Sequence, residues 1–284
     1  MRRQIVEPSR RLLPSRASLI EIVEALRTVL FPGYFGTSEI GSKSMPFYVG
    51  STLDRVMRQL REQLLRGLCS NCRQERPDCG ACEDRADHAA RTFLERLPEV
   101  RRLLATDVIA TYEGDPAATG HVEAIICYPG ILALTNHRLA HELYKLNIPL
   151  LPRIITEHAH SICGIDIHPG AQIGERLFID HGTGVVIGET TVIGNNVRIY
   201  QGVTLGAKSF PLDDQGRPIK GIARHPIVED EVIIYGGATI LGRVTIGRGS
   251  VIGGNVWLTN SLPAGSKVTQ ARARQDRYAD GAGI

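Results

Sequence analysis

The chain has 284 residues, which allows one or two domains with a sizeable core, and its apolar fraction of 43% is ordinary for a globular protein. A net charge of only +3, without a concentrated basic face, argues against a nucleic-acid partner. No apolar run is long enough to cross a membrane and the first residues lack the basic-then-apolar pattern of secretion, so we expect a cytoplasmic protein without membrane contact.

Helix signals dominate the first half of the chain. Residues 1–17 are rich in arginine and are expected to form a disordered basic tail, followed by a helical oligomerisation domain at residues 18–157. Ser18 and Glu21 match a capping box, and Pro32-Gly33 ends the first helical periodicity. Further helices are expected from Ser51 onward, from Ala89 to Thr111 with a break at Pro98 left open, and from Ile131 to Leu146.

Four of the six cysteines lie close together in this half. In a cytoplasmic protein they should be reduced or bound to metal rather than paired in disulfides. Two Cys-x-x-Cys pairs can supply four zinc ligands, although the six residues between the pairs are fewer than in a zinc ribbon. A structural zinc site and reduced thiols on a helix and loop both stay open for Cys69, Cys72, Cys79 and Cys82.

Branched aliphatic residues recur every six positions in the second half. Each six-residue unit predicts a short strand and a corner, so that stacked coils of a parallel β-helix bury a continuous aliphatic column. The expected fold class is therefore α+β, with the β-helix at 158–262, an ejected loop at 207–226 where the period is interrupted, and a flexible C-terminal tail at 263–284. The repeat positions are Ile167, Ile173, Ile179, Ile187, Ile193, Ile199, Leu205, Val228, Ile234, Ile240, Ile246, Ile252 and Leu258.

Three segments carry a family resemblance. DIHPGAQIGERLFIDHGTGVVIGET and the downstream ARHP resemble the core motif of the serine O-acetyltransferases, and the resemblance reaches back to DVIATYEGDPAA in the helical half. It is most specific in the segment from Asp180 to Gly184. The resemblance implies a left-handed β-helix and the transfer of an acetyl group from acetyl-CoA to the hydroxyl of L-serine, the first step of cysteine biosynthesis.

A hydroxyl is a poor nucleophile at neutral pH, so acetylation of serine needs a base that takes its proton. Histidine suits this task, and His181 interrupts the aliphatic repeat. The resemblance makes His181 the base and Asp166 the carboxylate that orients its imidazole. Asp166 lies 15 residues before His181. With three units to a coil of about 18 residues, the two side chains are expected close together on adjacent coils.

The resemblance also assigns the binding of both substrates. Asp115 and Asp180 would hold the ammonium of serine, Arg224 its carboxylate, and His225 would lie beside the reacting centre. Acetyl-CoA would lie along the β-helix near the loop. Its expected contacts are the backbone of the small residues Gly206, Ala207, Gly237 and Ala238, and the side chains of Lys208 and Lys267 at its phosphates.

Three other functions compete with this interpretation. A hexapeptide-repeat acyltransferase for a sugar or another amino acid would keep the base but not the paired charges for serine. A trimeric zinc carbonic anhydrase would need three converging histidines, and the β-helix offers only His168, His181 and His225. A non-enzymatic regulatory subunit is disfavoured by the intact base and substrate residues.

Two expectations concern partners. The resemblance implies trimers with active sites between β-helices, paired through the helical domains into a hexamer. The chain also ends on Ile284 behind a Gly-containing polar stretch. This tail resembles those of serine acetyltransferases that insert a terminal isoleucine into O-acetylserine sulfhydrylase, where its carboxylate takes charge-assisted hydrogen bonds.

Overall fold

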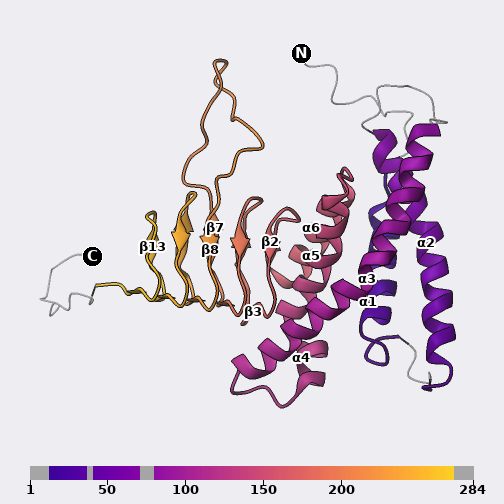
Figure 1. The fold of residues 1–284 in the computed structure, drawn as a ribbon, viewed down its shortest axis with the longest axis horizontal. Helices are drawn as coiled ribbons and strands as arrows, with labels where there is room; N and C mark the ends of the chain where they lie inside the picture. Colours follow the sequence, from indigo (N-terminus) through magenta and orange to yellow (C-terminus); the bar gives the residue numbers. More distant parts are fainter. Residues whose placement is uncertain (1–12, 37–40, 71–79, 272–284) are drawn as a thin grey trace, which may run out of the picture.

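A computed structural model describes residues 13–36, 41–70 and 80–271. Helices form the N-terminal part of the described chain, and a three-sided parallel β-helix forms the C-terminal part (Figure 1). The helices are α1 (Arg16–Leu30), α2 (Met45–Ser70), α3 (Gly80–Gly114), α4 (His121–Cys127), α5 (Pro129–Lys145) and α6 (Leu151–Cys163). None of these helices combines the length and apolarity that crossing a membrane requires.

The first helix begins before the predicted capping box. Its N-cap is Ser15, whose Oγ accepts a hydrogen bond from the N–H of Ser18 at 3.2 Å, so the prediction of a cap formed by Ser18 and Glu21 was wrong. Ser15 can take this role because an N-cap side chain bonds the N–H of the second or third helical residue. The predicted apolar stripe is nevertheless the buried face of α1.

Other helix boundaries also differ from the sequence prediction. α2 begins at Met45 rather than Ser51, since Pro46 is tolerated in the first turn of a helix. α3 continues through Pro98 without a break. The helical part ends with α6, which was not predicted, and the left-handed Gly164 (φ 70°) closes it beyond the expected boundary at residue 157.

The β-helix consists of three parallel sheets, and each coil contributes one short strand to each sheet, except that the last coil has none in sheet 2. Sheet 1 contains β1 (Asp166–Ile167), β4 (Val186–Ile187), β7 (Thr204–Gly206), β10 (Thr239–Leu241) and β13 (Trp257–Leu258). Sheet 2 contains β2 (Gln172–Ile173), β5 (Val192–Ile193), β8 (Ile227–Val228) and β11 (Thr245–Ile246). Sheet 3 contains β3 (Phe178–Ile179), β6 (Arg198–Ile199), β9 (Ile233–Ile234), β12 (Val251–Ile252) and β14 (Lys267–Val268).

The aliphatic column is confirmed as the core of the β-helix. Ile167, Ile187 and Leu205 pair in register across sheet 1, and every predicted repeat position is buried except Ile173, which is half-buried. Each coil donates backbone N–H groups to carbonyls of the following coil, as Val186 does to Val203 at 2.9 Å. The stack extends past the boundary predicted at residue 262, because β14 pairs with β12.

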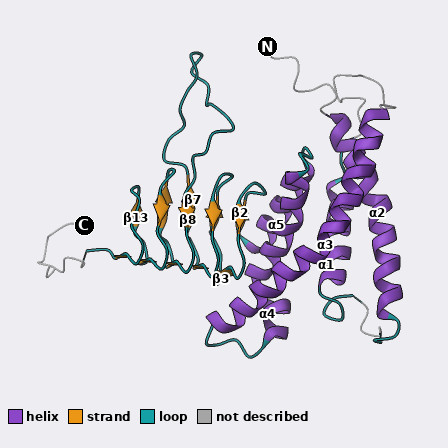
Figure 2. Cartoon of the chain, viewed as in Figure 1, coloured by secondary structure: helices purple, strands orange, loops and turns teal. Residues whose placement is uncertain are grey.

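Three columns of corners join the sheets, and we name them by the sheets that they connect. At the 3–1 corner, the first turn has six residues (180–185), whereas the equivalent turns at 200–203, 235–238 and 253–256 have four. The first coil therefore spans 20 residues, from Ile167 to Ile187, against 18 from Ile187 to Leu205. At the 1–2 corner, residues 207–226 separate β7 from β8 and project away from the stack (Figure 2).

Candidate active site

The enlarged turn of the 3–1 corner carries the predicted base. The side chain of His181 is 72% exposed and its backbone is left-handed at φ 54°, with Gly182 and Gly184 at φ 80°. A carboxylate oxygen of Asp180 lies 3.7 Å from the Nε2 of His181. Glycine gives the turn its positive φ angles at no steric cost, so the two extra residues present the imidazole outward from the stack.

A second carboxylate reaches the same corner from the helical part. Asp115 follows the end of α3 and accepts hydrogen bonds from the Tyr128 hydroxyl at 2.6 Å and from the Ala117 N–H at 2.8 Å. The Tyr128 hydrogen bond and then that of Ala117 lower the pKa of Asp115, with a further electrostatic contribution from His181. Burial and the neighbouring Asp115 raise the pKa of Tyr128. The corner therefore combines the ionised carboxylate of Asp115, the side chain of Asp180 and the accessible imidazole of His181.

Asp166 occupies a different neighbourhood. It lies beside Glu157 and His160 of α6, with one ligand atom of each within 4.8 Å of the others, and among the described residues no hydrogen bond or ion pair joins it to His181. The 20-residue first coil explains the difference, because 15 residues are three quarters of this coil rather than nearly a whole one. The turn is still stacked on the chain just before Asp166, since the Gly184 N–H donates to the Gly164 carbonyl at 2.8 Å.

The 1–2 corner holds a second group of polar residues. Arg224, at the base of the loop, donates from Nη2 to Glu189 at 2.8 Å, and the Tyr144 hydroxyl of α5 donates to the other oxygen of this carboxylate at 3.3 Å. Burial alone would raise the pKa of Glu189, but the guanidinium of Arg224, together with His168 and the Tyr144 hydroxyl, outweighs it and the pKa is lowered. The guanidinium is thus held in place by a carboxylate at the surface of the stack.

His225 is fixed by Thr190 in the same group. The ring Nδ1 accepts a hydrogen bond from the Thr190 N–H at 3.0 Å, and the Arg224 and His225 N–H groups donate to Thr190 Oγ1. Because Nδ1 is an acceptor, the neutral ring carries its proton on Nε2. Gly188 leaves the space for this ring, since a Cβ there would lie 2.0 Å from Cδ2 of His225. His225 is therefore a hydrogen-bond donor at Nε2.

We expect the protein to lose stability as the pH falls from about 6.5 to about 4. Burial and then the positive charge of Arg224 lower the pKa of His225 from 6.5 to about 4, so below pH 6.5 the unfolded chain binds a proton that the folded chain does not. The loss attributable to His225 is up to about 3 kcal/mol. It can be measured as the free energy of unfolding in urea at several pH values, for wild type and for the His225→Asn variant, whose amide oxygen can replace the Nδ1 acceptor.

Other buried histidines also make the folded protein less stable as the pH falls. Burial lowers the pKa values of His137, His141 and His168, and these residues contribute equally to both proteins. The difference between the two pH profiles therefore isolates His225. Parallel profiles would contradict the assignment of a neutral His225.

The two polar groups lie on opposite edges of sheet 1. Asp115, Asp180 and His181 lie at the 3–1 corner, whereas Arg224 and His225 lie at the 1–2 corner, and no hydrogen bond or ion pair joins the groups within the described chain. A side of about six residues, which spans up to about 20 Å when extended, separates the two corners. The three histidines of the alternative zinc site likewise do not converge within this chain, because His181 is at one corner and His225 at the other.

The predicted acetyl-CoA residues divide between the same two corners. Gly206, Ala207 and Lys208 lie at the 1–2 corner, whereas Gly237 and Ala238 lie at the 3–1 corner. The N–H groups of Gly237 and Ala238 donate to carbonyls of Gln201 and Tyr235 in the stack, and the Ala238 side chain is fully buried. Lys267 is exposed on β14, in sheet 3.

Several residues that organise the site were not predicted from the sequence. Tyr128 orders Asp115, while Glu189 and Thr190 hold Arg224 and His225. Glu189 and Thr190 follow a repeat glycine inside the recognised motif, which was an available signal, whereas Tyr128 offered none. Of the predicted cysteine cluster, Cys69 lies in the last turn of α2 and Cys82 in the first turn of α3, while Cys72 and Cys79 lie outside the described residues, as does the terminal Ile284.

Comparison with known proteins identifies relatives along nearly the whole chain. The plasmid serine acetyltransferase of Synechococcus elongatus is 56% identical over 275 residues, covering 96% of this chain and 86% of the relative. A serine acetyltransferase of Mycobacterium tuberculosis is 48% identical over 57% of this chain and 67% of its own length. No family model matches the chain.

Solved structures resemble the fold as well. Serine acetyltransferase 1 of Entamoeba histolytica in complex with L-cysteine is 38% identical, with a TM-score of 0.77 over 87% of this chain and 86% of that one. The soybean serine acetyltransferase complexed with serine is 29% identical, with a TM-score of 0.58 over 92% of this chain and 99% of that one. The likeness therefore includes both the helical part and the β-helix.

Proposed function

The chain belongs to the serine acetyltransferase family, and on this premise we propose that it acetylates the hydroxyl of L-serine with acetyl-CoA at a site formed by the 3–1 corner of one copy and the 1–2 corner of another. The observation that carries this is the separation of complementary charges. Two carboxylates flank the accessible His181 at one corner, and a guanidinium stands beside His225 at the other. A serine zwitterion needs both signs of charge around the hydroxyl that reacts.

His181 acts as the base. It takes the proton of the serine hydroxyl while the oxygen attacks the thioester carbonyl, which forms a C–O bond and a tetrahedral intermediate. Collapse of the intermediate breaks the C–S bond, and the proton held by His181 passes to the departing thiolate of CoA. Asp166 orients the imidazole once the exposed ring turns from Asp180 toward it, which fixes the tautomer and stabilises the imidazolium.

Serine is held through both of its charged groups. Asp115 and Asp180 bind the ammonium close to His181, and Arg224 of a neighbouring copy binds the carboxylate in a bidentate manner. Glu189 occupies the guanidinium in the free chain, so the serine carboxylate takes the place of a carboxylate that is already bound there. Glu189 thus keeps Arg224 oriented until serine binds.

The 1–2 corner would also receive acetyl-CoA. His225 donates its Nε2–H toward the reacting thioester, where a donor stabilises the negative charge that develops on the carbonyl oxygen. Gly206 and Ala207 allow close approach of the pantetheine, with Gly237 and Ala238 of the facing corner opposite. Lys208 and Lys267 meet the phosphates.

Assembly follows from the divided site. We propose that left-handed β-helices associate as trimers, which complete three sites, and that the helical domains pair two trimers into a hexamer. In the cytoplasm the product would enter cysteine biosynthesis, and the tail ending in Ile284 would bind O-acetylserine sulfhydrylase.

The activity is tested by measuring CoA thiol release from acetyl-CoA with L-serine, L-homoserine, L-threonine and glucosamine as acceptors. L-Serine should give the highest kcat/KM, and Asp115→Asn should raise the KM for serine more than the KM for acetyl-CoA. A preference for glucosamine would instead establish the sugar acyltransferase alternative. Absence of thiol release with every acceptor would refute an acyltransferase of this kind.

A further inference from the structure

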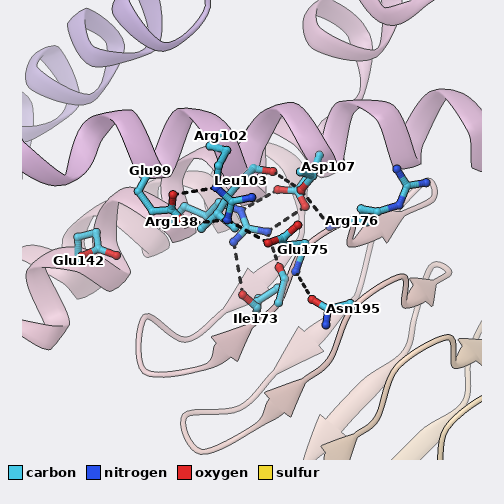
Figure 3. Close-up of polar contacts among 12 residues, drawn as sticks. Glu99, Arg102, Leu103, Asp107, Arg138, Glu142, Ile173, Glu175, Arg176 and Asn195 are labelled. Atoms are coloured by element: carbon cyan, nitrogen blue, oxygen red, sulfur yellow. Dashed lines mark hydrogen bonds and ion pairs between the residues drawn. The ribbon is translucent and has the colours of Figure 1, made fainter.

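A buried ion pair connects the helical part to the first coil of the β-helix. Arg138 of α5 donates from Nε to one oxygen of Asp107 on α3 at 2.7 Å and from Nη2 to the other at 2.9 Å. The side chains of Arg138 and Asp107 are only 4% and 0% exposed. Figure 3 shows the guanidinium between Asp107 and the backbone of Ile173. None of the proposed catalytic steps uses this pair.

The pair also satisfies the backbone of the first coil. Carbonyls of the first coil that face the second coil accept from it, as Glu175 does from the Asn196 N–H at 3.1 Å, whereas carbonyls that face the helices have no preceding coil to accept from. Arg138 fills this role, donating to the Gly174 carbonyl at 2.9 Å and to the Ile173 carbonyl at 3.4 Å. In return, Asp107 accepts from the Leu177 N–H at 3.0 Å. Five groups from two helices and the first coil are thus joined at a single point.

Both segments that leave this point lead to the site. Along α3, Asp115 follows Asp107 by about two turns. Along the coil, Asp180 follows Leu177 by three residues. Between them Gly114 contacts Phe178, where an added Cβ would lie 2.4 Å from the ring. The distance between the two carboxylates that receive the serine ammonium therefore depends on how α3 is registered against the first coil.

From these contacts we infer that Asp107 and Arg138 are positioning residues, which set the spacing of Asp115 from Asp180 and His181 and thereby the affinity for serine. The inference rests on the proposed function, because it assigns those carboxylates to the serine ammonium. A planar guanidinium can bond both carboxylate oxygens and two carbonyls at fixed angles, which an ammonium on a flexible stem cannot do. The geometry of the pair, beyond its charge, fixes the register.

The test compares KM values in the full-length protein. Arg138→Lys keeps the charge but loses the planar fork, and we expect it to raise the KM for serine by about 10- to 100-fold, since small misplacements of binding groups have effects of this size. The KM for acetyl-CoA should change less than about threefold, because the proposed coenzyme residues lie on later coils. Asp107→Asn should show the same split.

Two controls separate positioning from stability. Arg102→Gln removes an exposed ion pair with Glu175 that joins the same helix to the same turn, and it should leave the serine KM unchanged. Leu97→Ala opens a cavity in the buried face of α3 far from the turn, and it should lower the melting temperature without the KM split.

Three results would overturn the inference: an unchanged serine KM in a folded Arg138→Lys variant, an equal rise in both KM values, or the same split in Leu97→Ala. If both single variants unfold, the double variant Asp107→Asn, Arg138→Gln buries no unpaired charge and takes their place. If the two single variants and the double variant all fail to fold, the pair serves the fold alone and the inference is refuted. A wild-type protein that does not acetylate serine would refute the proposed function, a different result from any of these.

Discussion

The His181→Asn variant is expected to lose about two to four orders of magnitude in kcat, because the base that activates the serine hydroxyl is removed. Asparagine is the informative replacement. His181 has a left-handed backbone at φ 54°, a conformation that asparagine adopts more readily than most residues, so the turn should keep its shape. The measurement is the serine-dependent release of CoA at saturating concentrations of both substrates.

Asn255 provides a matched control for the backbone. It lies in the equivalent corner of a later coil with φ 56°, so Asn255→Ala tests the effect of disturbing such a turn without touching the base. This control should stay within a few-fold of wild type. A well-folded His181→Asn variant with near wild-type turnover would remove His181 from the mechanism.

Two inactive variants are expected to regain activity when their subunits are mixed. His181→Asn disables the 3–1 corner and Arg224→Ala disables the 1–2 corner, and each protein alone should be nearly inactive. If every site combines one corner from each of two copies in a ring, random mixing of equal amounts restores about one quarter of the sites. The mixture is unfolded in urea, refolded together and assayed for serine acetylation.

The control for this experiment uses two variants of the same corner. His181→Asn mixed with Asp180→Asn leaves every site with a damaged 3–1 corner, so no recovery should follow. If the pair from different corners also fails to recover, each site is completed within one chain.

The sequence predicted the β-helix better than the helices. Aliphatic residues at every sixth position are explained by burial in a single column, so positions such as Ile187 and Leu205 were predictable. Helix ends depend on competition between neighbouring residues. Ser15 rather than Ser18 caps α1, and no single residue in the sequence decides between them.

Local motifs also predicted the site only in part. The charges of Asp115, Asp180, His181 and Arg224 were recognisable from their segments, but their distribution over two corners depends on coil length. The step of eight residues from Ile179 to Ile187 is visible in the sequence, but that the two extra residues enlarge the 3–1 corner was known only from the positions of β3 and β4. Asp107 and Arg138 escaped notice because their contact joins positions far apart in the sequence, and both look like ordinary helix-surface charges there.

The carbonyls of the first coil that face the helices have a further consequence for solubility. A strand edge with free hydrogen-bonding groups is a template on which another chain can add strands. Here α5 covers the edge through Arg138, and His141 accompanies it by contacting the Pro169 carbonyl at 2.8 Å. A chain that began at β1 would expose the edges of all three sheets at once, and another chain could add strands to them. The helices therefore cover this end of the β-helix and prevent other strands from adding to it.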